Sequence, residues 1–146
     1  MTNQDKIFQE ALLYKGVKEV DSIGVNEMIK SWITWAMPWT ENEIDVDSKY
    51  AWCAIFPSRI MFDLGLLPKN KPIIRALDYL KIGKKINEPV KGCFAVLDRG
   101  KGKGHVTFFC KFTKDGYFQG FGGNQQNKIG HNEFDIKRVL GYISLD

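Results

Sequence analysis

The apolar positions in the first half of the chain recur at the three- and four-residue spacing of amphipathic helices. This spacing predicts helices over residues 4–14, 26–36, 52–65 and 72–80. Pro72 suits the first turn of the last of these helices, and Gly83 closes it. Residues 37–50 show little period and predict a loop.

After Pro89 the pattern changes to short runs rich in Val, Phe, Ile and Tyr, which predict strands. The runs cover residues 92–98, 105–112, 117–121 and 139–144, and residues 114–116 predict a hairpin turn. The polar stretch 127–135 predicts a loop that contains His131. Helices followed by antiparallel strands indicate one α+β domain over residues 1–146, with the helices packed on one face of the sheet.

Composition narrows the classes of protein. A hydrophobic content of 44% excludes a disordered chain. The sequence contains no run of 18 apolar residues, so we expect no membrane-spanning helix. The net charge of +4 is modest, and its scattered basic residues match no nucleic-acid-binding motif, so we expect no nucleic acid partner. The polar N-terminus lacks a secretion signal, which predicts synthesis in a host cytoplasm without export by that route.

Three widely spaced cysteines favour neither a disulfide framework nor a zinc site, so we expect a free thiol, no metal and no cofactor. Cys53 stands at the predicted start of a helix, where unpaired N–H groups and the helix dipole stabilise an anion. This position predicts a lowered thiol pKa and a nearby oxyanion site. The alternative is a small buried core residue.

A cysteine nucleophile needs a base, and the chain has only two histidines. His105 follows the glycine-rich stretch 99–104 at the head of a predicted strand, so it is the candidate base; the alternative is a solvated histidine at a strand end. Asn124 is the preferred third residue to orient the imidazole, although its Gly-Gly-Asn run also suits an ordinary turn. Asp98 is the competing candidate.

At these residues the chain resembles a known family. Residues 52–56 read Trp-Cys-Ala-Ile-Phe and resemble the Trp-Cys-Ala-Ala-Phe signature of a bacterial and phage family related to the NlpC/P60 and CHAP cysteine peptidases. Further matches follow in the family's order across nearly the whole chain. They lie at residues 11–19, 79–83, 88–92, 104–106, 122–125 and 138–142.

The resemblance implies a papain-like fold in which Cys53, His105 and Asn124 carry catalysis. It implies a peptidoglycan hydrolase, either an N-acetylmuramoyl-L-alanine amidase or a stem-peptide endopeptidase, that forms a cysteine thioester. Such single-domain proteins include phage endolysins, which wait in the cytoplasm and act on the cell wall after release. We expect a monomer whose partner is peptidoglycan. The other hypotheses are a papain-like protease or transferase with another substrate, and a non-catalytic wall-binding or virion module.

Three aromatic residues near Cys53 are expected to contact the substrate: Trp39, Tyr50 and Trp52. Pro57 departs from the family pattern because it removes an N–H four residues after the nucleophile, so the helix must start late or bend there. The loop before His105 is also unusually basic, with Arg99, Lys101 and Lys103. These charges favour a thiolate and an anionic substrate but disfavour a protonated imidazole; a solvated hairpin tip is the alternative.

Overall fold

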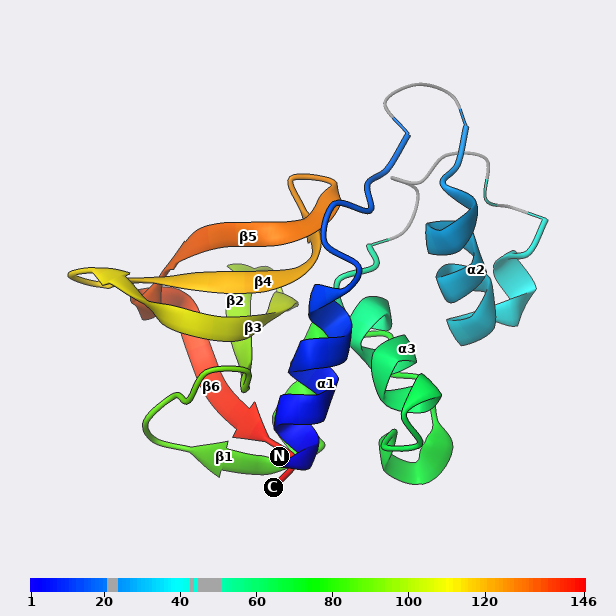
Figure 1. The fold of residues 1–146 in the computed structure, drawn as a ribbon. Coiled ribbons are helices and arrows are strands. Elements are labelled where there is room, and N and C mark those ends of the chain that lie inside the picture. The colour runs from blue at the N-terminus through cyan, green and yellow to red at the C-terminus, as the bar shows by residue number, and fades with distance from the viewer. Residues whose placement is uncertain (21–23, 43, 45–50) are drawn as a thin grey trace.

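An antiparallel sheet with helices along one face forms the fold in the computed structural model, which describes residues 1–20, 24–42, 44 and 51–146 (Figure 1). The α-helices are α1 (Asn3–Leu12), α2 (Glu27–Ala36) and α3 (Ile55–Asp63), and the short 3₁₀ helices are η1 (Pro38–Thr40), η3 (Pro68–Asn70), η4 (Ala76–Lys81) and η5 (Ile136–Arg138). The strands are β1 (Lys84–Ile86), β2 (Phe94–Gly100), β3 (Lys103–Lys114), β4 (Tyr117–Gln125), β5 (Lys128–Asp135) and β6 (Val139–Ser144). The α+β class is thereby confirmed.

The strands of the described residues form one sheet in the order β1-β6-β2-β3-β4-β5. Every pairing is antiparallel, and the β3–β4 pair turns at Asp115-Gly116, as the hairpin prediction required. The pairing of β4 with β5 is irregular between Gly122 and Gln125. This irregularity is a β-bulge, which bends the strand and re-aims the side chains that follow it.

The two faces of the sheet bury different sets of side chains. The face toward the helices carries Phe94, Val96, Val106, Phe108 and Phe121 in one cluster with residues of α1, α2 and α3. The opposite face carries a smaller cluster of Cys93, Ala95, Leu97, Phe109, Phe118 and Phe134. Side chains alternate between the faces of a strand, so neighbouring residues of β3 enter different clusters.

Helix α1 lies directly against the sheet, where the Phe8 ring is 5.5 Å from Phe108 and 6.4 Å from Phe121. Its N-terminus is closed by a capping box between Thr2 and Asp5, which contributes about 1 kcal/mol to helix stability. The backbone N–H groups of Asn3 and Gln4 also donate to the Asp146 carboxylate, which joins the two ends of the chain seen side by side in Figure 1.

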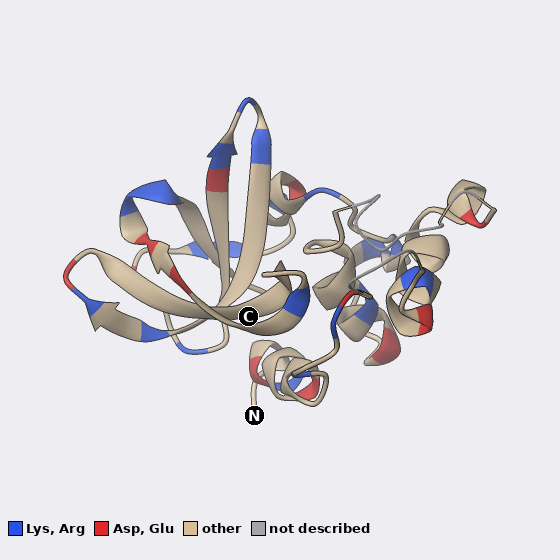
Figure 2. Ribbon diagram, turned by 90° about the horizontal axis from the view of Figure 1, so that it is seen from above, with Lys and Arg blue, Asp and Glu red and all other residues tan. Residues whose placement is uncertain are grey.

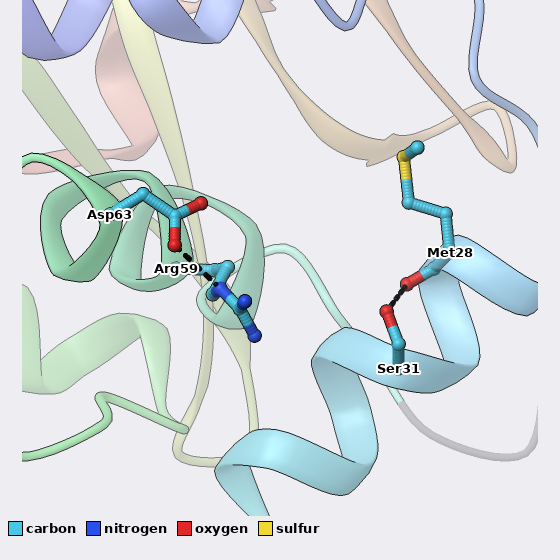
Figure 3. Close-up of polar contacts among 4 residues, drawn as sticks. All are labelled: Met28, Ser31, Arg59 and Asp63. Carbon is cyan, nitrogen blue, oxygen red and sulfur yellow. Dashed lines mark hydrogen bonds and ion pairs between the residues drawn. The ribbon is translucent and has the colours of Figure 1, made fainter.

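Helices α2 and α3 pack together through aromatic side chains. The rings of Trp32 and Phe56 lie 5.3 Å apart, and Arg59 places its guanidinium 5.3 Å from the Trp35 ring. Arg59 also forms an ion pair with Asp63 at 2.9 Å on the exposed side of α3, and Ser31 donates to the Met28 carbonyl within α2 (Figure 3). Exposed ion pairs of this kind add only about 0.3–0.5 kcal/mol, so the aromatic contacts dominate this packing.

Three sequence predictions about the elements need correction. The predicted helix over residues 72–80 is extended as far as Arg75 and continues only as η4, because the Ile73 N–H donates to Ser58 Oγ and ties this segment to α3. Two strands, β1 and β5, lie where no strand was predicted. In β5 only Ile129, Gly130 and Phe134 are buried, so an edge strand with a mostly polar surface reads as a loop.

Among the described residues, no helix is both long enough and apolar enough to cross a membrane.

Candidate active site around Cys53 and His105

Cys53 lies in the turn that leads into α3 rather than in the helix itself. The helix begins at Ile55, and Ala54 is its N-cap. Pro57 is therefore the third helical residue, and the N–H groups on either side of it, those of Phe56 and Ser58, donate to the carbonyls of Trp52 and Ala54. The late start that Pro57 predicted is confirmed, and the proline removes the one i−4 donor that the Cys53 carbonyl would otherwise have.

The Cys53 thiol is buried and is surrounded by main-chain donors. Burial raises its pKa, and hydrogen bonds from the backbone of Val106, Ala54 and Cys53 itself, together with the charge of Arg99, act in the opposite direction. The predicted lowering of the thiol pKa is therefore wrong, because the cost of desolvating a thiolate exceeds the stabilisation from the helix start. The side chain is neutral at pH 7.

Tyr79 fixes the turn that carries the thiol. Its hydroxyl is completely buried and donates to the Ala54 carbonyl at 2.5 Å. Burial also raises the pKa of Tyr79 well above its ordinary value, so the hydroxyl keeps its proton and stays a donor. Sequence reasoning gave Tyr79 no role in the site, since it lies 26 positions beyond Cys53 and only the packing of η4 brings it there.

His105 lies in β3 next to Val106, whose N–H contacts the thiol. The alternation of the strand places Gly104 and Val106 toward the helices and His105 and Thr107 on the opposite face. On that face the His105 ring lies 5.5 Å from Phe134 and is only 1% exposed. The strand therefore lies between the thiol and the imidazole, and the backbone of Val106 is their shared neighbour. Among the described residues, no hydrogen bond joins the two groups.

Gln125 orients the imidazole. Its Oε1 lies 3.1 Å from His105 Nε2 and accepts a hydrogen bond from Thr107 Oγ1 at 2.7 Å, while its Nε2 donates to Gly120 and Gly130 carbonyls. Because an acceptor faces His105 Nε2, we assign the proton of the neutral ring to that nitrogen. Nδ1 then carries a bare lone pair, and it is buried without a partner among the described residues.

The orienting residue is thus Gln125 and not the predicted Asn124. Asn124 has a left-handed backbone with φ of 57° at the bulge of β4, and its neighbour Gln125 turns into the buried face. A bulge shifts the alternation by one residue, and no sequence pattern marked its position. The competing candidate Asp98 is exposed, and its carboxylate accepts from the Gly100 N–H.

Burial lowers the pKa of His105 to about 4. The positive charges of Arg99 and Arg138 act in the same direction, and the hydrogen bond to Gln125 opposes them. At pH 7 the ring is neutral and its Nδ1 can accept a proton. The free protein therefore holds a neutral thiol and a neutral imidazole on opposite faces of β3, in place of a thiolate–imidazolium pair.

The three aromatic residues expected to contact the substrate, and the second histidine, do not gather around Cys53 as one group in the described structure. Trp52 is completely buried and donates from Nε1 to Glu19 at 2.8 Å, so its side chain presents no surface to a substrate. Trp39, in η1, is 68% exposed, whereas Tyr50 lies outside the described residues. His131 belongs to β5 rather than to a loop, and its ring lies 5.0 Å from that of Phe121 in a tilted arrangement.

The Gly-Gly-Asn run that suggested a turn instead allows close packing in β4. A Cβ at Gly123 would lie 2.8 Å from the Trp52 ring and 3.1 Å from Phe56 Cβ. Only glycine leaves room for Trp52 to pack against the sheet, so this run positions the residue directly before the nucleophile.

A cavity of about 520 Å³ opens beside Cys53. Three segments line it, and His105 is not among the described lining residues, which are Ala51, Cys53, Ile74, Arg75, Ala76, Leu77, Asp78, Arg99, Gly102, Lys103 and Gly104. Its size suits a small ligand or a short peptide. A ligand in this cavity would reach the thiol from the helix-facing side of β3.

The described residues contain no group of three or more His, Cys, Asp or Glu side chains that could hold a metal ion. Cys53, Cys93 and Cys110 are all free and buried. In comparisons with known proteins, no family model matches the chain and no curated protein matches it significantly.

Proposed function

We propose that this protein is a papain-like cysteine hydrolase that cuts amide bonds of bacterial peptidoglycan, of the type found in phage endolysins. One observation carries the proposal. The Cys53 thiol lines a peptide-sized cavity and is held by the N–H of Val106, the residue directly after a histidine whose Nδ1 is free to accept a proton.

Neutral partners suit a reaction in which the proton moves as the bond forms. His105 Nδ1 takes the thiol proton while Sγ attacks the amide carbon, and the imidazolium then protonates the leaving amine. The C–N bond breaks and a thioester remains. A water molecule, deprotonated by His105, attacks the thioester; the C–S bond breaks, and the products are a carboxylic acid and the regenerated thiol.

Cys53 and His105 lie on opposite faces of β3 in the free protein, so the proposal requires β3 and the His105 ring to rearrange on substrate binding before the proton passes from sulfur to the imidazole. Nδ1 is the ring nitrogen nearer to the main chain, and Val106 N–H already fixes the sulfur at the next residue. The N–H groups of Cys53 and Ala54 that face the sulfur are available to stabilise the oxyanion.

The resemblance of residues 52–56 and the other matched segments supports peptidoglycan as the substrate and the papain-like fold as the scaffold. The bond cut is the amide between muramic acid and L-alanine or a bond within the stem peptide. No metal or cofactor enters the reaction as proposed, and the enzyme works as a monomer.

The test is digestion of purified sacculi, followed by mass spectrometry of the released fragments. Wild-type protein should release muropeptides with a new amino terminus, and Cys53→Ala should release none. Cys110→Ala is the matched control, because Cys110 is a buried free thiol of β3 that does not line the described cavity. Release of the same fragments by Cys53→Ala, or no release by wild type, contradicts the proposal.

A second candidate function is a non-catalytic wall-binding or virion module that kept this scaffold. It is favoured by the absence, among described residues, of a hydrogen bond between Cys53 and the imidazole. Such a module would bind sacculi in a pull-down without releasing fragments. Slow alkylation of Cys53 at pH 7 does not separate the two functions, because burial raises the thiol pKa in either case.

A further inference from the structure

The cavity beside Cys53 carries an excess of positive charge. Arg75, Arg99 and Lys103 line it together with a single carboxylate, Asp78. None of these four side chains forms an ion pair with another described residue. The hairpin between β2 and β3 supplies two of the cations, and Figure 2 shows basic positions on both arms and at the tip of this hairpin, which extends away from the rest of the sheet.

Of the three cations that line the cavity, Arg99 is the one whose charge shifts the pKa of both Cys53 and His105. Its charge acts on both the Cys53 thiol and the His105 imidazole, which lie on different faces of β3. Arg99 also lines the cavity beside the thiol. Arginine offers five N–H donors in a planar fork that matches a carboxylate with two hydrogen bonds.

The wall of the cavity below these cations is apolar and closely packed. Ile74, Ala76 and Leu77 line it, and a Cβ at Gly104 would lie only 2.6 Å from Leu77 Cδ2. A side chain at position 104 would therefore clash with Leu77, which lines the cavity. The cavity thus combines an apolar wall, a nucleophile and cations that form no ion pair with another described residue, which together fit a peptide with an anionic group.

We propose that the cavity binds a peptide through a carboxylate close to the scissile amide, with Arg99 as its main partner and Arg75 and Lys103 adding charge. The inference rests on the proposed hydrolase function and names the substrate feature which that site selects. A single carboxylate is favoured over a polyanion such as nucleic acid, because Asp78 stands among the cations and repels additional negative charge.

The carboxylate has two chemical sources, an internal acidic residue or the C-terminus of the peptide. Four synthetic forms of one stem-type tetrapeptide separate them: both groups free, only the internal group amidated, only the C-terminus amidated, and both amidated. Calorimetric titration into the Cys53→Ala protein measures binding without hydrolysis. The form with the recognised carboxylate should bind about 10- to 100-fold tighter than the fully amidated form, as expected for charge-assisted hydrogen bonds.

The matched variants, Arg99→Gln and Lys101→Gln, both lie in the β2–β3 hairpin. Arg99→Gln in the Cys53→Ala background should remove the preference for the carboxylate, and Lys101→Gln should keep it, because Lys101 is not among the described residues that line the cavity. Equal affinity for free and amidated peptides, or equal losses in the two loop variants, would overturn the inference.

Hydrolysis of the four peptides by wild-type protein is measured separately. Equal cleavage rates for free and amidated forms would overturn carboxylate selection and leave the hydrolase proposal standing. A binding preference that depends on Arg99, without cleavage of any form, would support the binding site and contradict the hydrolase.

Discussion

The two sides of β3 hold their reactive groups in different ways. On the helix-facing side, Cys53 lies in a turn beside an open cavity and is contacted by main-chain N–H groups. On the other side, His105 is sealed beneath Phe134 and fixed by the side chain of Gln125. Yet burial favours the neutral form of the side chain on both sides. It raises the pKa of the Cys53 thiol and lowers the pKa of the His105 imidazole.

The helix start at Cys53 and the strand position of His105 therefore do not by themselves determine whether these side chains are charged. A few backbone dipoles and one hydrogen bond oppose desolvation at each group, and desolvation is the larger effect in both. The proposed enzyme then relies on proton transfer during attack and does not start from a thiolate. Four predictions test the two sides against each other.

The largest effect is expected from removal of the base. His105→Gln should lower hydrolysis about 100- to 10,000-fold, since the thiol is neutral and needs a proton acceptor. Turnover of a soluble muropeptide, followed by mass spectrometry, measures this loss. His131→Gln, which alters a half-buried histidine of β5, should retain activity. Comparable losses in both variants would show that His105 has no special place in the reaction.

The next effect concerns stability against pH. Because the pKa of His105 is lowered to about 4, the unfolded chain binds a proton between pH 6.5 and 4 that the folded protein does not. Stability should therefore fall as pH drops through this range and level off below it, with a loss of about 3 kcal/mol from this group. Urea unfolding at several pH values measures it.

His105→Gln is the control for this pH dependence. The variant should lack that part of the decline, and the difference between the two proteins isolates the contribution of His105. Identical pH profiles would mean that the imidazole titrates normally in the folded protein, and the two sides of β3 would then differ in ionisation after all.

Replacement of Gln125 tests what holds the imidazole side. Gln125→Leu should lower the free energy of unfolding by about 2–3 kcal/mol, because it leaves buried Gly120 and Gly130 carbonyls and the Thr107 hydroxyl without their partner. Nitrogen NMR of the His105 ring should also show the proton leaving its fixed position on Nε2. Gln119→Leu, on the same strand, is the control, and an equal cost there would contradict the assigned role.

The smallest effect is expected on the thiol side. Trp52→Phe should cost about 2 kcal/mol, because the buried Glu19 loses its donor while most of the ring packing remains. Thermal unfolding measures the change, with the exposed Trp39→Phe as control. If Trp52→Phe is no more costly than the control, Trp52 does not anchor the turn that carries Cys53.

Much of the fold follows from local pattern. Helices α1 and α2 were predicted almost to the residue, since their apolar stripes are long and each has a side-chain cap at Thr2 or Asn26. Strands β2, β3, β4 and β6 and the β3–β4 turn were also predicted. Strand β5 was missed because its polar edge reads as a loop, and η4 was overestimated because Ser58 holds Ile73 extended.

The sequence by itself determined the α+β class, the late start of α3 that Pro57 causes and the choice of Cys53 and His105 as the chemical candidates. These depend on residue type and short-range spacing, which are complete within a few positions of the chain. Only the tertiary structure decided that Gln125 and not Asn124 holds the imidazole, that Tyr79 fixes the nucleophile turn, and that the thiol pKa is raised. A bulge, a contact 25 positions apart and burial of the sulfur produce these results, and each depends on which distant segments pack together.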